Sequence, residues 1–179
     1  YWSSGLTSGY GLRLNTTDGQ LSGRWGAVNS SIFTTNWNYT FVGSDKFVYY
    51  CFAKCPGWID VTTYVGNGDV DGPYVGLNCS PAWVWIRKVS GAAWPTFLKD
   101  MPESNTGNGT ANITNSDRQP HEWLNLSDGV NYTDTNNNNI DFLAGGIKIK
   151  EDNSSLNADG STYVVFAVAD VAAKYALAQ

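Results

Sequence analysis

The stretch Tyr163-Val164-Val165-Phe166-Ala167-Val168-Ala169 decides the fold class. A continuous run of β-branched and aromatic residues of this length indicates a β-strand. The same pattern occurs 116 residues earlier as Phe47-Val48-Tyr49-Tyr50-Cys51-Phe52-Ala53. Runs of this kind, separated by Gly, Asn, Asp and Pro clusters, predict strands over residues 31–34, 38–42, 46–53, 59–65, 82–88, 140–143, 146–150 and 161–169. Many short strands joined by polar loops predict an all-β jelly-roll or lectin-like β-sandwich.

A second block is also repeated. Leu14-Asn15-Thr16-Thr17-Asp18-Gly19 returns 110 residues later as Leu124-Asn125-Leu126-Ser127-Asp128-Gly129. Two blocks in the same order at nearly the same offset indicate a duplicated unit of roughly 110–120 residues. We therefore expect residues 1–57 to be the C-terminal half of a first β-sandwich repeat, and residues 58–179 to be a complete second repeat.

Half a sandwich cannot close its own core. Residues 1–57 would expose Leu12, Leu14, Ile32, Phe33, Phe41, Phe47 and Val48. At about 25 cal/mol per Å², several hundred Å² of apolar surface is worth on the order of 10 kcal/mol. This half therefore either packs on the complete domain or is completed by strands of another chain. The second option, applied head to tail, is a heterologous contact that builds filaments.

Composition narrows the functional class. Only 15% of the 179 residues are charged, 42% are hydrophobic and eight are Trp, which excludes disorder and is typical of an all-β extracellular or virion protein. A net charge of −5 with no basic stripe argues against nucleic acid as a partner. No apolar run approaches the roughly 18 residues of a membrane span. The start at Tyr1, without an initiator Met or signal-peptide pattern, predicts a piece of a longer chain.

Asn-x-Ser/Thr triplets are over-represented. About three such triplets would arise by chance from this composition. They are N-glycan acceptors only in a secretory or equivalent pathway. Loops rich in Asn, Ser and Thr could produce the excess without any function. We expect instead a surface covered by covalent N-glycans. The nine candidate acceptors are Asn15, Asn29, Asn38, Asn78, Asn108, Asn112, Asn125, Asn131 and Asn153.

The three cysteines leave one unpaired. Cys51 alternates with large apolar residues, which predicts a buried free thiol. It cannot readily bridge to Cys55, because four extended residues span about 13 Å and a disulfide needs Cα atoms within about 7 Å. Cys55 and Cys79 each lie at the end of an element, just before or near a proline. We predict a Cys55–Cys79 disulfide, which would fit an oxidising, extracellular setting.

Candidate sites for chemistry are few. Asn67, Asp69 and Asp71 imitate the start of a calcium loop, but Asn78 stands where the twelfth-position Glu is required, and a tight turn explains these residues equally well. His121, the single histidine, has no partner motif for a catalytic triad or zinc site. We expect no catalytic residues, no cofactor and no metal.

Aromatic residues offer two other uses. Trp83 and Trp85 share one strand face and could stack on sugar rings, although core packing is the commoner role. Aromatic residues near turns or the open end are better candidates for an interface, and these are Tyr1, Trp2, Trp37 and Trp58.

Several motifs in order resemble one known domain family. They are residues 64–75, 81–88, 140–143, 146–149, 157–164 and 173–179, with residues 24–26 and 47–53 similar to the tail of a preceding copy. Together they resemble an uncharacterised repeat domain of aquatic phage tail-fibre and virion proteins and of bacterial surface proteins. The resemblance implies a concanavalin-like β-sandwich with a structural or adhesive role and no established catalytic residues. Cys55, Cys79 and the density of glycosylation triplets depart from that pattern.

The sequence therefore predicts a structural, non-enzymatic subunit of an extracellular or virion-surface assembly. We expect self-association into a head-to-tail glycosylated filament, completed by β-strand contacts between subunits. The alternative is a carbohydrate-binding adhesin or phage tail-fibre module whose partner is a surface carbohydrate.

Overall fold

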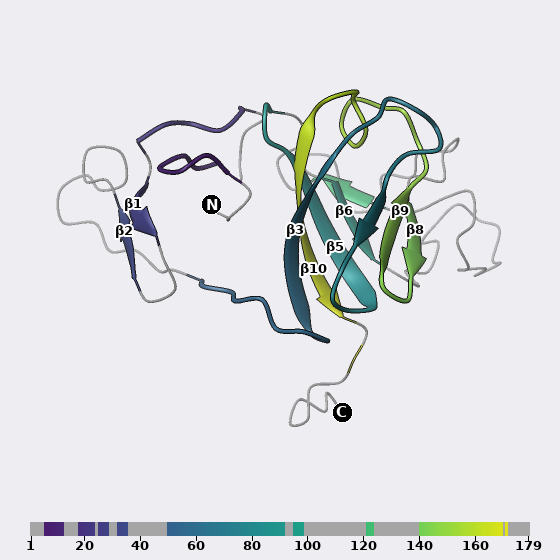
Figure 1. Cartoon of the computed structure of the whole chain (residues 1–179), viewed down its shortest axis with the longest axis horizontal. Coiled ribbons are helices and arrows are strands. Elements are labelled where there is room, and N and C mark those ends of the chain that lie inside the picture. The colour runs from purple at the N-terminus through teal and green to yellow at the C-terminus, as the bar shows by residue number, and fades with distance from the viewer. Residues whose placement is uncertain are drawn as a thin grey trace.

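The protein is all-β in the part that a computed structural model describes, residues 6–12, 18–23, 25–28, 32–35, 50–91, 95–98, 121–123, 140–169 and 171. These residues contain ten strands and no helix (Figure 1). The strands are β1 (Trp25–Val28), β2 (Phe33–Thr35), β3 (Ile59–Val65), β4 (Tyr74–Gly76), β5 (Pro81–Lys88), β6 (Pro95–Leu98), β7 (His121–Trp123), β8 (Ile140–Leu143), β9 (Gly146–Ile149) and β10 (Thr162–Ala169).

Two antiparallel sheets form the sandwich. One has five strands in the order β3-β10-β5-β6-β7, and the other has three in the order β4-β9-β8. β10 pairs along its length with both β3 and β5. Its continuous apolar run fits this place, because a strand with neighbours on both sides and packing on both faces has few positions for polar side chains.

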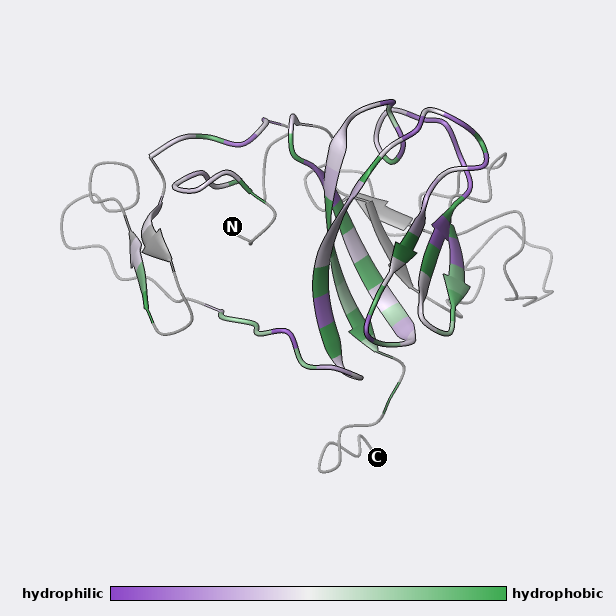
Figure 2. Ribbon diagram, in the orientation of Figure 1, coloured by the Kyte–Doolittle hydropathy of each residue, from purple (hydrophilic) through white to green (hydrophobic). Residues whose placement is uncertain are grey.

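The main core lies between the two sheets. Its fully buried members come from both layers, with Val84 and Ile86 on β5, Val165 on β10 and Ile147 and Ile149 on β9. Figure 2 shows hydrophobic bands along β3, β5 and β10, and hydrophilic colour in the loops that join strands at one end of the sandwich. The predicted sandwich class is thus confirmed, while its jelly-roll connectivity stays a prediction.

Residues from the start of the chain pack on part of the opposite face of the five-stranded sheet. We call residues 6–12, 18–23, 25–28 and 32–35 the N-terminal unit. Its Leu6 and Leu12 are buried against Val164 of β10, in a second core cluster separate from the first. In Figure 1 the five-stranded sheet lies between this unit and the three-stranded sheet. Of the seven apolar residues expected to need cover, Leu12 is buried here and Ile32 and Phe33 are exposed, while the other four lie outside the described residues. The choice between the two options therefore stays a prediction.

The predicted strands agree with most of the observed ones. The strands expected at 59–65, 82–88, 140–143, 146–150 and 161–169 are confirmed within one residue, and that at 31–34 is found as β2. Residues 38–42, the loop from 103 to 120 and most of the terminal stretch 169–178 lie outside the described residues. β1, β4, β6 and β7 were not predicted.

One strand prediction is wrong. Residues 50–53 of the expected strand 46–53 form no strand, and Tyr50, Cys51 and Phe52 are exposed. The matching residues of β10 are held by partners on both sides, whereas no described strand pairs with 50–53. The prediction that Cys51 is buried therefore also fails, although its thiol is free. In the described part of the chain, no helix is long and apolar enough to span a membrane.

Candidate functional site

The candidate site is the seam where the N-terminal unit docks on the outer face of the five-stranded sheet. Leu6 and Leu12 supply its apolar part, and Val61, Trp85 and Val89 pack around them as partly buried neighbours. Burying two leucines is worth roughly 1.5–3 kcal/mol each. The unit is held internally by reciprocal backbone hydrogen bonds between Gly11 and Leu21, at 3.0 and 2.8 Å.

The repeated Asp-Gly pair lies at the polar part of the seam. The backbone carbonyl of Asp18 accepts a hydrogen bond from Nη2 of Arg87, a β5 residue that is only 1% exposed. Burial lowers the pKa of the Arg87 guanidinium to about 10, and the nearby charge of Asp18 acts in the opposite direction. Arg87 remains charged at neutral pH, so this bond gives the buried cation a charge-assisted hydrogen-bond partner. Next to them, the Gln20 N–H donates to the carbonyl of Val89 at 2.9 Å.

The close approach of Gly19 to the sheet explains why the repeated Leu14–Gly19 block has a glycine at this position. A Cβ built on Gly19 would lie 2.8 Å from the carbonyl oxygen of Ser90 and 2.9 Å from its carbonyl carbon. Real Cβ atoms do not approach backbone so closely, so any side chain would push the unit away from the sheet. The duplication pointed to this block, but nothing in the sequence pointed to Arg87 or Ser90 as its contacts. In the second copy, Asp128 and Gly129 lie outside the described residues.

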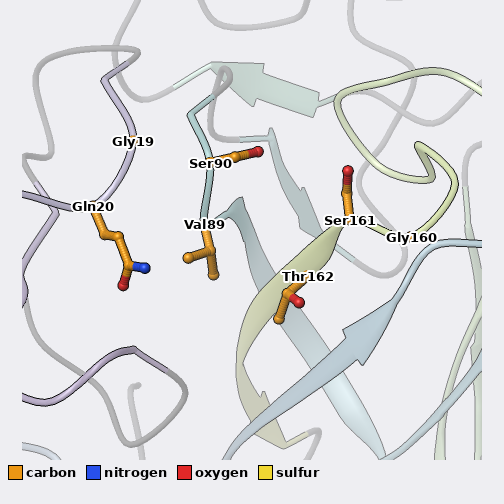
Figure 3. A pocket seen from close by; sticks show the side chains of 7 residues that line it. All are labelled: Gly19, Gln20, Val89, Ser90, Gly160, Ser161 and Thr162. Atoms are coloured by element: carbon orange, nitrogen blue, oxygen red, sulfur yellow. The ribbon is translucent and has the colours of Figure 1, made fainter.

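A cleft opens along this seam. It has a volume of about 400 Å³. Figure 3 shows Gly19 and Gln20 of the N-terminal unit on one side, Val89 and Ser90 in the middle, and residues 160–162 at the start of β10 on the other. Its lining includes the polar side chains of Gln20, Ser90, Ser161 and Thr162, and no charged side chain is among them. The seam thus combines the close approach of Gly19 to Ser90 with an incompletely filled cleft beside it.

Replacing Gly19 with alanine should loosen the seam without unfolding the sandwich. The added Cβ meets backbone atoms of Ser90 that cannot move aside, so the N-terminal unit must shift. We expect the Gln20 amide to exchange its hydrogen about tenfold faster, equivalent to about 1.4 kcal/mol. Native-state hydrogen exchange measures this. Gly76→Ala is the matched control, because its new Cβ would find Tyr74 at an ordinary 3.7 Å. Equal protection in both variants would show that the close approach is unimportant.

The other end of the outer face carries an aromatic patch. Phe166 of β10 has ring contacts with Phe52, Trp83 and Trp85 at centroid distances of 5.2, 5.7 and 6.4 Å. Such edge-to-face contacts are typical of packed aromatic clusters. Trp83 and Trp85 are half-buried in it, which fits packing better than a free sugar platform. Phe52, which is 62% exposed, extends the patch to the surface. Trp58, directly before β3, is 46% exposed.

Of the predicted interface residues, only Trp58 is described. It follows Gly57 in a turn, and its carbonyl accepts a hydrogen bond from the Ala169 N–H at 2.8 Å. The exposed indole therefore stands beside the edge strand β3. Tyr1, Trp2 and Trp37 lie outside the described residues.

The calcium candidates form a hydrogen-bonded turn. Asn67 Oδ1 accepts the Asp69 N–H at 3.1 Å, and Asp69 Oδ1 accepts the Asp71 N–H at 2.9 Å. Asp71 pairs with Lys148 at 2.8 Å, which lowers the pKa of its carboxyl. The chain's own donors thus occupy the oxygens that an ion would need, as an Asx turn requires. Among the described residues no three His, Cys, Asp or Glu side chains gather as metal ligands.

The predicted disulfide between Cys55 and Cys79 is absent, and both cysteines are free. Cys79 belongs to the main core, whereas Cys55 is exposed in the turn before β3. Burial, followed by the charge of Asp60, raises the pKa of the Cys79 thiol. The two thiols therefore lie in different environments, Cys79 in the core and Cys55 at the surface.

Two of the nine glycosylation candidates are described. Asn78 is exposed, and its Nδ2 donates to Oδ2 of Asp60 at 3.1 Å. A glycosylated amide keeps one N–H, so this bond and a glycan are compatible, and the bond would orient the sugar. Asn153 is half-buried in a turn in which its Oδ1 accepts the Ser155 N–H at 2.7 Å. The triplets at Asn15, Asn29, Asn38, Asn108, Asn112, Asn125 and Asn131 lie outside the described residues.

The fold and the seam define a class: an all-β sandwich protein whose outer sheet face receives a preceding segment of chain. Within that class, the chain belongs to a family described as a domain of unknown function (DUF7483), whose profile matches residues 1–171. The match runs through residue 57, where the sequence predicts a boundary between repeats, and that division stays a prediction. No curated protein and no solved structure matches the chain.

Proposed function

We propose that the protein is a non-enzymatic structural subunit of an extracellular or virion-surface assembly. The assembly is a head-to-tail filament of glycosylated β-sandwich units, joined by contacts between subunits that include β-strand pairing. The observation that carries this proposal is the docking seam. An outer sheet face built to receive a segment from earlier in the sequence supports the joining of successive units, because donor and acceptor surfaces differ and need not close into a ring.

The edge of β3 supports the strand contacts. In an antiparallel pair alternate residues direct their backbone groups away from the partner strand. The Gly66 N–H bonds to Ser161, so the residues that face β10 are the even-numbered ones, and Thr63 and Val65 direct their backbone groups outward. No described strand pairs with β3 on that side. Open edges of this kind are sites of strand addition.

Exposed apolar side chains lie along the same edge. They are Val65 on β3 and Trp58 directly before it. Aromatic residues of this kind are enriched at protein interfaces. A neighbouring subunit that adds a strand to β3 would cover them, and this supports the self-association that we propose.

Electron microscopy of the native material tests the assembly. We expect regular filaments with an axial repeat set by one sandwich unit. Discrete particles without regular contacts would rule the filament out. Mass spectrometry of peptides that contain Asn15, Asn78 and Asn125 tests the glycan covering, and unmodified Asn in all three peptides would contradict it.

A second function is favoured by the cleft at the seam. Its uncharged lining of hydroxyl, amide and backbone groups suits the hydroxyls of a sugar, which supports a carbohydrate-binding adhesin or phage tail-fibre module. A glycan array with the wild type and with Thr162→Ala tests this function. Binding that is lost in the variant supports it, and an array without any bound glycan removes it.

A further inference from the structure

We infer that the N-terminal unit of one copy docks on the outer sheet face of another copy, so that the seam seen within one chain is the joint of the filament. This inference rests on the proposed function and names its acceptor surface. The partner is a second copy of this chain, and its contribution is the unit that carries Leu6, Leu12 and Gly19.

The contacts of the seam can pass between chains unchanged. On the donor side they involve Leu12, the Asp18 carbonyl and the Gln20 N–H, and on the acceptor side Arg87 and Val89. An exchanged copy would form the same bonds at the same positions, which is why exchange of an identical element is a low-cost route to assembly.

The donor unit is held together apart from the sheets. Gly9 accepts the Trp25 N–H at 3.3 Å, and Thr7 and Gln20 exchange two hydrogen bonds at 3.1 and 3.0 Å. β1 pairs with β2 and with no strand of the two large sheets. The unit can therefore move as one piece, and the incompletely filled cleft at the seam makes its release easier.

The connecting chain is long enough for exchange. Fourteen residues, 36–49, join the end of β2 to the described stretch that leads into β3. At about 3.3 Å per residue they reach up to about 46 Å. A compact domain of 120 residues has a radius of gyration of about 14 Å and a diameter of about 35 Å. The unit can thus reach the next subunit while its own sandwich stays in place.

Concentration decides between the two arrangements. A short peptide connection within one chain gives the donor an effective concentration of about a millimolar. Docking inside the chain therefore wins in dilute solution, and docking between chains wins where subunits are delivered at a higher local concentration. Since each subunit has one donor and one acceptor at different places, the exchanged assembly is open-ended.

Two complementary full-length variants test the exchange. Gly19→Val spoils the donor, because its side chain would meet the Ser90 backbone, but leaves the acceptor intact. Arg87→Met spoils the acceptor, because it removes the bond to Asp18 and keeps the packing of the stem, but leaves the donor intact. In an equimolar mixture the good donor of one meets the free acceptor of the other. We expect a heterodimer that grows no further, at least about tenfold more abundant than either homodimer.

Native mass spectrometry with isotope-labelled chains counts the species. A mixture that stays monomeric while the wild type forms filaments would overturn the exchange and leave the filament in place. The same holds if either variant alone forms filaments as the wild type does. A wild type that never assembles, even at millimolar concentration, overturns both. Gln20→Pro is a second donor variant in case Gly19→Val fails to fold, since it removes the N–H to Val89, and Gln20→Ala, which keeps that N–H, is its control.

Discussion

Replacing Asn157 with alanine should lower the free energy of unfolding by about 2–4 kcal/mol, because it removes three hydrogen bonds between two loops, each worth about 0.5–1.5 kcal/mol. The Asn157 side chain is fully buried. Its Oδ1 accepts the Asn67 N–H at 2.9 Å, and its Nδ2 donates to Asn67 Oδ1 and to the Asp69 carbonyl at 2.8 and 2.7 Å. One amide thus joins the loop of residues 66–73 to that of residues 153–161.

The surroundings of Asn157 leave no easy substitute for these bonds. The backbone of the two loops is in close contact, since a Cβ on Gly66 would lie 2.3 Å from the Ala158 carbonyl oxygen. The rings of Tyr64 and Tyr163 stack with centroids 4.8 Å apart. Tyr163 Oη accepts the Ala158 N–H at 2.8 Å, which holds the loop of residues 153–161 against this pair.

Urea denaturation of the wild type and variant measures the effect. Asp159→Ala is the control, because Asp159 is exposed on the same loop and surface changes usually stay within about 0.5 kcal/mol. If Asn157→Ala costs no more than this control, the two loops are held by their backbones alone and the side chain is dispensable.

The sandwich itself could be predicted where strands carry their own signal. β3, β5, β9 and β10 are long or strongly apolar, and their runs stand out from the turns around them. β4 contains a glycine, β6 begins with a proline and β7 is His-Glu-Trp. Such short segments become strands because β9, β5 and β6 offer backbone groups beside them, which is a tertiary effect that overrides local propensity.

The reverse error occurred at residues 50–53. There the local pattern matches β10, but no described strand lies beside it, so the apolar residues remain at the surface. A local sequence pattern indicates which residues can form a β-strand, but not whether a neighbouring strand is present to pair with it.

The candidate site was predictable only in part. The need to cover Leu12 follows from the apolar surface of the first half, and its burial is confirmed. Duplication drew attention to Asp18 and Gly19, but their role depends on Arg87 and Ser90, about 70 residues away in the sequence. Contacts at that separation leave no local pattern.

Replacing Asp60 with asparagine should cost about 2–4 kcal/mol at neutral pH, because it breaks a buried charged network. Asp60 is 2% exposed. Its Oδ1 accepts the Val61 N–H at 2.8 Å and pairs with Lys54 at 3.1 Å, and its Oδ2 accepts the Asn78 N–H at 2.8 Å. An amide in this place has one acceptor oxygen, and its NH2 group would face donors.

The same network makes stability depend on pH. Burial alone would raise the pKa of Asp60, but the Asn78 N–H and Lys54 outweigh it and hold the pKa below the ordinary 3.8. A carboxyl with a lowered pKa in the folded state stabilises the fold above 3.8, and this stability is lost as the pH falls below 3.8 through the folded-state pKa. The wild type should therefore lose stability in this acid range, and Asp60→Asn should lose less.

Asp71→Asn is the matched control for Asp60→Asn. The pKa of Asp71 is also lowered, by Lys148, but its side chain is 80% exposed. Solvent screens such a pair, and its removal should affect stability much less than the removal of the Asp60 carboxylate. Thermal unfolding of the three proteins between pH 2.5 and 7 compares the two carboxylates. It measures how much stability is lost when the buried Asp60 and the exposed Asp71 are each replaced. Equal losses in both variants would mean that burial of Asp60 adds nothing to its ion pair. A large loss in Asp60→Asn alone would show that this carboxylate stabilises the turn before β3 through its bonds to Lys54 and Asn78. That turn carries Trp58, next to the edge proposed to meet the next subunit, and Asn78 is one of the candidate glycan acceptors.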